Sequence, residues 1–148
     1  MKYVITLLTL ILFACSPVKD DDPVATATIP TDNGSTNSPS YSDNNTTYVV
    51  TASGGKFYLD SVQQKTLTFR RGYTYNFNST NSSTDSHPLY IGTNSTGGGY
   101  SDEYTSGVTN SRTTNGTLVF VVPANAPNTL YYNCGAHSNM GAEITIVN

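Results

Sequence analysis

The sequence predicts an all-β domain, and three observations lead to this fold class. Short runs of alternating apolar and polar residues recur from residue 46 to the end of the chain, as half-buried strands require. Gly, Asn and Ser separate these runs, and no segment shows the period of an amphipathic helix. The composition agrees, because 11 tyrosines and many threonines favour strands.

Seven or eight strands are expected, and this number in about 100 residues suits a Greek-key β-sandwich. Gly54-Gly55 predicts a hairpin between the first two strands. The run at 117–122 is apolar on both faces, so we expect it inside a sheet. The last strand should turn Ile144 and Ile146 toward the core. The expected strands are 48–52, 56–60, 66–70, 73–77, 88–91, 117–122, 129–134 and 142–147.

Residues 1–14 are expected to be a lipoprotein signal peptide. Lys2 precedes an apolar run that is too short to span a bilayer and that ends in Leu12-Phe13-Ala14-Cys15. This tetrapeptide resembles the lipobox of bacterial lipoproteins, and the resemblance implies that Cys15 is lipidated and anchors the protein to a membrane. A plain secretory signal that is cleaved nearby is the alternative.

Residues 15–45 are expected to form a flexible tether in the cell envelope. They consist mainly of Ser, Thr, Asn, Asp and Pro, so they bury too little apolar surface to offset the entropy of ordering. Lys19 followed by Asp20-Asp21-Asp22 resembles the surface-export signal of Bacteroidetes lipoproteins. The resemblance implies the outer membrane, with display on the cell surface, although the periplasmic leaflet stays open as an alternative.

The charge of the expected domain, residues 46–148, argues against nucleic acid as a partner. This part of the chain holds five basic and five acidic side chains, so the formal net charge of −3 comes from the residues before it. A neutral domain lacks the basic surface that binding to phosphates requires. We expect a monomer with no nucleic-acid partner.

Four possible metal ligands remain once the initiator methionine and the lipid-anchor cysteine are set aside: His87, Cys134, His137 and Met140. The last three lie within seven residues, on a strand end and the short loop after it, where they can point at one centre. His87 starts a strand 47 positions earlier, which a sandwich can bring alongside. Two His and one Cys with a weak axial Met are the ligands of blue-copper electron-transfer sites, whereas zinc makes no use of the thioether.

The segment Tyr131–Met140 and the strand after it resemble the C-terminal motif of the cupredoxins, the group of plastocyanin, amicyanin and azurin. The Cys-x2-His-x2-Met spacing is closest to that of amicyanin. Residues 71–77, followed by His87, resemble the strand that leads to the family's first histidine ligand. The resemblance covers about residues 47–148.

This resemblance implies a cupredoxin-like sandwich that binds one copper ion. His87, Cys134 and His137 would be the strong ligands, and Met140 the axial one. Pro88 departs from the family pattern, because it has no N–H to offer to the cysteine sulfur.

The expected function is electron transfer with an unidentified protein redox partner, because a closed site of four ligands has no place for a substrate. An enzyme is not expected, since no nucleophile, base or open metal position can be assembled from the sequence. Two alternatives stay open. One is a protein that scavenges or delivers copper through the same ligands, and the other is a copper-free cupredoxin-like module for adhesion or assembly.

The predicted lipid anchor and the predicted surface-export signal can be tested directly. Cys15→Ser should move the protein from the membrane fraction to the soluble fraction, because the acyl chains would have no attachment point. Replacing residues 19–22 by Ala should protect the protein from protease added to intact cells. If this variant is digested as fast as the wild type, surface export is wrong while the lipid anchor stands.

Overall fold

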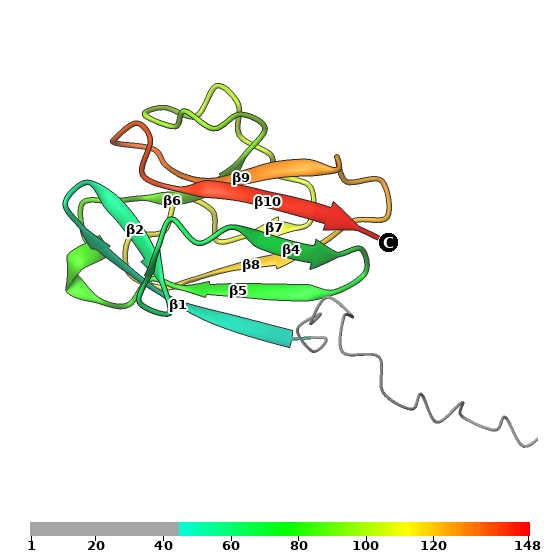
Figure 1. The fold of residues 1–148 in the computed structure, drawn as a ribbon, viewed down its shortest axis with the longest axis horizontal. Helices are drawn as coiled ribbons and strands as arrows, with labels where there is room; N and C mark the ends of the chain where they lie inside the picture. Colours follow the sequence, from blue (N-terminus) through cyan, green and yellow to red (C-terminus); the bar gives the residue numbers. More distant parts are fainter. Residues whose placement is uncertain (1–44) are drawn as a thin grey trace, which may run out of the picture. The chain divides into compact units, whose positions relative to one another are not determined.

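The computed structural model describes residues 45–148, and these form a β-sandwich (Figure 1). Its strands are β1 (Asn45–Ser53), β2 (Lys56–Leu59), β3 (Val62–Gln63), β4 (Leu67–Arg70), β5 (Thr74–Asn78), β6 (Leu89–Gly92), β7 (Val108–Thr109), β8 (Thr117–Val121), β9 (Thr129–Cys134) and β10 (Ala142–Val147). One 3-10 helix, η1 (Ser82–Thr84), precedes β6. The larger sheet has the order β3-β2-β1-β5-β8-β7, and the smaller one β4-β10-β9-β6. The all-β class and the Greek-key sandwich are confirmed.

The predictions for the N-terminal part fall outside the described residues. This applies to the signal peptide at 1–14, to the lipidated Cys15 and to the linker at 15–45, of which only Asn45 is described. Asn45 already belongs to β1. Within the described part of the chain, no helix has the length and apolar character needed to cross a membrane.

The strand predictions agree closely with the structure. β9 and β10 have the predicted bounds, and the other six predicted strands are all present with slightly different ends. β8 lies between β5 and β7, inside its sheet as expected. Its second face is only partly buried, although it is apolar, and Val121 is 47% exposed. β3 and β7 were not predicted, because two residues are too few to show an alternation.

Both sheets are mixed, and the chain changes sheet repeatedly. β1 pairs with β5 in parallel, and β10 pairs with β4 in parallel, while the remaining pairs are antiparallel. β4 belongs to the smaller sheet, β5 to the larger one and β6 to the smaller one again. The C-terminal strand β10 (red in Figure 1) lies between β9 and β4. This path places β6 directly beside β9.

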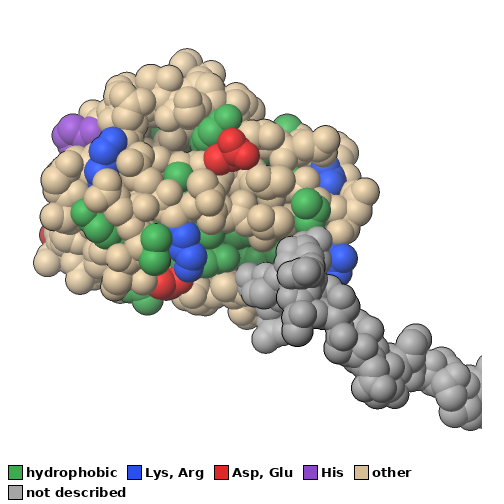
Figure 2. Space-filling view, in the orientation of Figure 1, with side chains coloured by type: hydrophobic (Ala, Val, Ile, Leu, Met, Phe, Trp, Pro, Cys, Tyr) green, Lys and Arg blue, Asp and Glu red, His purple; other side chains and the backbone are tan. Residues whose placement is uncertain are grey.

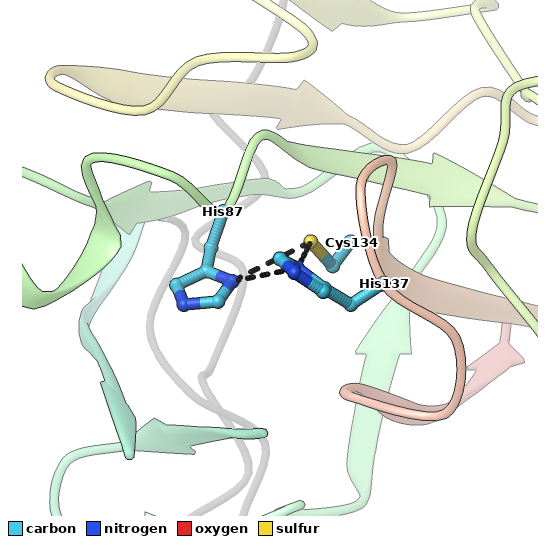
Figure 3. A group of neighbouring side chains, drawn as sticks. All are labelled: His87, Cys134 and His137. Atoms are coloured by element: carbon cyan, nitrogen blue, oxygen red, sulfur yellow. Dashed lines mark hydrogen bonds between the residues drawn. The ribbon is translucent and has the colours of Figure 1, made fainter. Parts of the chain in front are cut away.

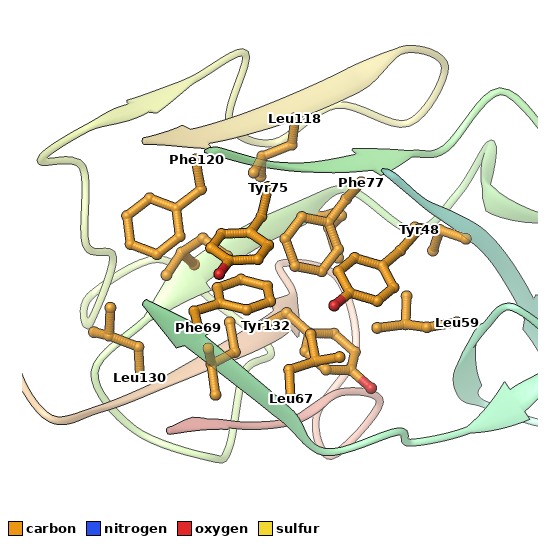
Figure 4. Packing of buried hydrophobic residues seen from close by; sticks show 14 of the residues in the cluster. Tyr48, Leu59, Leu67, Phe69, Tyr75, Phe77, Leu118, Phe120, Leu130 and Tyr132 are labelled. Carbon is orange, nitrogen blue, oxygen red and sulfur yellow. The ribbon is translucent and has the colours of Figure 1, made fainter. Parts of the chain in front are cut away.

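Aromatic rings fill the space between the sheets (Figure 4). Phe69 stacks face to face on Tyr75, with ring centroids 3.6 Å apart and planes within 1° of parallel. The hydroxyl groups of Tyr75 and Tyr132 keep polar partners inside the core. The hydroxyl of Tyr75 accepts a hydrogen bond from the amide of Arg70 at 2.9 Å, and that of Tyr132 donates to the carbonyl of Lys65 at 3.0 Å.

Truncation of this core should cost much of the domain's stability. Phe69 is fully buried, so Phe69→Ala should lower the free energy of unfolding by about 3–5 kcal/mol through lost burial and a cavity. Val121→Ala, at an exposed position, should change it by less than about 0.5 kcal/mol. Urea unfolding measures both, and similar losses for the two variants would contradict this packing.

Candidate metal centre

The pairing of β6 with β9 brings the first ligand histidine to the cysteine. The two strands are antiparallel, and Leu89 lies opposite Cys134. His87 stands two residues before Leu89, and so it enters the space beside the end of β9. The amide of Gly135 donates to the carbonyl of Pro88 at 2.9 Å, which extends the ladder past the cysteine.

Three donor atoms converge at this end of the domain (Figure 3). The Nδ1 atoms of His87 and His137 are 3.1 Å apart, and the Sγ atom of Cys134 lies 3.8 Å from the first and 3.7 Å from the second. A point equidistant from the three atoms lies about 2.1 Å from each, within the range of about 2.0–2.3 Å that nitrogen and thiolate ligands keep to zinc. The triangle therefore has the size that a first-row metal ion needs.

A short turn fixes the approach of His87. The amide of His87 donates to the carbonyl of Thr84, the last residue of η1, at 2.8 Å. Thr84 is fully buried, and its hydroxyl oxygen lies within hydrogen-bonding distance of the carbonyl oxygens of Ser79 and Asn81 before it and of Thr114 after it. Because this hydroxyl joins η1 to the chain on either side, the histidine extends from an anchored turn rather than from a free loop.

The loop between β9 and β10 carries His137 and is held by the segment 93–107. The amide of Gly98 donates to the carbonyl of Cys134 at 2.9 Å, and the amide of Asn139 donates to the carbonyl of Thr96 at 2.6 Å. Gly97 and Ser138 form an isolated bridge in the same place. The glycine-rich stretch at 97–99 thus supports the ligand loop.

Two glycines allow close approach within this loop. A Cβ atom at Gly141 would overlap the carbonyl oxygen of Tyr132, and one at Gly135 would overlap the ring of Tyr100. The first contact lets the loop return tightly against β9 at the start of β10. The second lets Tyr100 cover the backbone beside Cys134. Larger residues at either place would move the ligand loop.

Met140 lies inside the domain, in the same buried cluster as Cys134. Its side chain is 1% exposed, and its carbonyl accepts a hydrogen bond from the amide of Phe57 at 2.9 Å. Of the four predicted site residues, the structure brings together the donor atoms of three, His87, Cys134 and His137. The role of Met140 as axial ligand stays a prediction.

Burial sets the protonation of the thiol and of one imidazole. Burial raises the pKa of Cys134, and the backbone amides of Ala136 and His137 partly offset this rise by acting on the sulfur. Burial lowers the pKa of His87, and the nearby His137 lowers it further. A neutral His87 presents a lone pair to a metal, whereas Cys134 must lose a proton before it binds one. The sulfur thus has backbone hydrogen-bond donors from the ligand loop, although Pro88 has no N–H to donate.

The three donors differ in exposure. Cys134 is fully buried, His87 is half-buried and His137 is exposed. Histidine side chains reach the surface at one end of the domain (purple in Figure 2). An ion in this centre would have its thiolate shielded from solvent and one imidazole facing outward.

Three residues around the centre were not predicted from the sequence. Gln64 and Lys56 donate to carbonyls of the ligand loop, and Tyr100 lies against Gly135. The ring of Tyr100 also stacks under the guanidinium of Arg112, at 4.1 Å. None of these residues belongs to a ligand type or a motif, so only the fold brings them to the site.

No family model matches the chain, and no curated protein matches it in sequence. Among solved structures, reduced rusticyanin at 1.9 Å is 18% identical with a TM-score of 0.47, over 72% of this chain and 82% of that one. A rusticyanin mutant at 1.5 Å and rusticyanin from Thiobacillus ferrooxidans at 1.27 Å have TM-scores of 0.48 and 0.46, with 18% and 17% identity. Each spans 72% of this chain and 80% of its own. At these identities the similarity concerns the fold alone.

Proposed function

We propose that this protein binds one copper ion through His87, Cys134 and His137, with Met140 as a weak axial ligand, and transfers single electrons at the cell envelope. The observation that carries the proposal is the triangle of Nδ1, Nδ1 and Sγ atoms, with sides of 3.1, 3.8 and 3.7 Å. Its size suits a metal ion, and its chemistry selects which one.

The donor set favours copper over zinc. Two imidazoles and one thiolate with a thioether nearby are the ligands of blue-copper sites, and thiolate and thioether both suit Cu(I). Structural zinc sites take four strong ligands in a tetrahedron, and among residues 45–148 three strong donors meet here. The buried Met140 adds a ligand that copper uses and zinc does not.

The backbone contacts that hold the ligand residues in place favour electron transfer as the function. Copper in this centre would carry one electron by changing between its two oxidation states. The segments around η1 and 93–107 hold the backbone of His87 and of the ligand loop, so the donors keep their places whichever state is present. The exposed His137 offers a partner protein a route to the buried sulfur. Rigid ligands and one outward imidazole are what a small electron carrier requires.

The location belongs to the same proposal. The lipobox-like sequence ending in Cys15 supports a lipid anchor, and the residues from 16 up to the start of β1 are enough to hold the domain away from the membrane. We place the protein at the outer membrane, facing the cell surface, where its redox partner would be another envelope protein.

The first test is the colour of the purified protein with Cu(II). We expect an intense blue or green absorption from charge transfer between the Cys134 thiolate and copper. Cys134→Ser should abolish it, because a hydroxyl supplies no comparable transition. Met140→Ala should shift it while copper stays bound. A colourless wild type holding one equivalent of Cu(II) would rule out a blue-copper site, and a failure to bind copper would favour the adhesion module.

The second test separates an electron carrier from a copper-delivery protein. Ascorbate should bleach the colour, and reoxidation should restore it with all the copper still bound, since the held ligand loop fits both states. Copper retained after desalting of the reduced protein measures this. His137→Gly, which removes the exposed ligand, should retain less copper. Release of copper from the reduced wild type would instead favour delivery.

A further inference from the structure

The loop that carries Met140 is held from outside by residues 56–64, which comprise β2, β3 and Gln64 and are called the β2–β3 hairpin below. The Nε2 atom of Gln64 donates to the carbonyl oxygen of Asn139 at 3.2 Å and to that of Gly141 at 2.8 Å. These two carbonyls lie on either side of Met140 in the chain. An amide group has two N–H donors, so one side chain can bridge both carbonyls at once.

The same hairpin supplies two further donors to this short stretch. The Nζ atom of Lys56 donates to the carbonyl of Asn139 at 2.6 Å, and the amide of Phe57 donates to the carbonyl of Met140 at 2.9 Å. Each carbonyl from Asn139 to Gly141 therefore accepts a hydrogen bond from the β2–β3 hairpin. Among the side chains that the structure describes, that of Gln64 bridges the carbonyls on both sides of Met140.

The backbone at both ends of this bridge is in a rarely used conformation. Asn139 has φ of +59°, and Gln64 has φ of +45°. Residues other than glycine adopt such angles at a cost and keep them only where surrounding contacts hold them. The amide of Gln64 donates to the carbonyl of Phe57 at 2.9 Å, which anchors the bridging residue in its own hairpin.

We propose that Gln64 is a positioning residue for the metal site. Its side-chain amide fixes the backbone on both sides of Met140, and it thereby sets how closely the thioether approaches an ion held by Cys134 and the two histidines. The hydrogen bonds of the Gln64 side chain go to the backbone of the ligand loop, so it would act through that loop and not as a ligand. The inference rests on the proposed function, because the direction of the thioether matters only when an ion occupies the centre.

The neighbouring glutamine provides a matched control. Gln64→Asn keeps an amide and a residue that tolerates positive φ, but the side chain is one methylene too short to bridge both carbonyls. Gln63→Asn makes the same change at an exposed position, where the side chain accepts a hydrogen bond from the hydroxyl of Tyr58 at 2.9 Å. Both changes are to be made in the full chain, alone and together with Met140→Leu.

Two readouts test the inference. With Cu(II) bound, Gln64→Asn should shift the positions and relative intensities of the charge-transfer bands, and Gln63→Asn should leave them unchanged. The shift should vanish in the Met140→Leu background, where no thioether remains to be positioned. Before copper is added, hydrogen exchange at the Phe57 amide should be about tenfold faster in Gln64→Asn, because the loop that accepts its bond is released.

The outcomes separate this inference from the proposed function. Unchanged bands and exchange in Gln64→Asn, with a coloured wild type, would overturn the positioning role and leave copper binding intact. A band shift that persists without Met140 would also overturn it, since Gln64 would then act through another group. A wild type that stays colourless with Cu(II) would overturn the proposed function and the inference together.

Discussion

β6 and β9 run side by side with Leu89 opposite Cys134, and the two halves of the site meet because of this register. The side chains of a strand alternate between faces, so a slip by one residue would turn the buried thiol to the other face of the sheet. The hydrogen bond from Gly135 to Pro88 continues the same ladder beyond the cysteine. The turn η1 then positions His87, and the loop after β9 positions His137. The donor triangle is thus a consequence of strand pairing in the smaller sheet, and the mixed topology of the sandwich is what makes these two strands neighbours.

The apolar core and the hydrogen bonds around the site have different effects on the ligand residues. The aromatic core below the centre buries Cys134 and Met140, which raises the pKa of the thiol and keeps it protonated until a metal competes for it. Around the rim, hydrogen bonds from the segment 93–107 and from the β2–β3 hairpin hold the ligand loop by its backbone. Both effects act before an ion arrives, so the donor atoms already stand at distances that suit one. Donor atoms that are held in place in this way support the proposed electron transfer.

Much of the fold was predictable, because strands with one buried face leave an alternating pattern and glycines mark the turns between them. β9 and β10 are predicted to the residue for this reason. Pairing partners were not predictable, since alternation does not say which strand lies beside which, and the parallel pairs of β1 with β5 and of β4 with β10 carry no local signal. The three strong donors were found because His and Cys are rare in this chain and clustered near its end. The proposed role of Gln64 was not predictable, because it depends on a hydrogen bond to Asn139, which lies 75 positions away in sequence.

X-ray absorption at the copper edge tests the central claim most directly, because it counts the ligands of the bound ion by element. The arrangement of His87, Cys134 and His137 predicts one sulfur and two nitrogen ligands, all at about 2.0–2.3 Å as such donors keep to first-row metals. The sulfur contribution at this short distance should disappear in Cys134→Ser, because the proposed axial sulfur of Met140 binds only weakly. A copper ion surrounded only by nitrogen and oxygen in the wild type would contradict the account, because the buried thiolate would then have no part in the site.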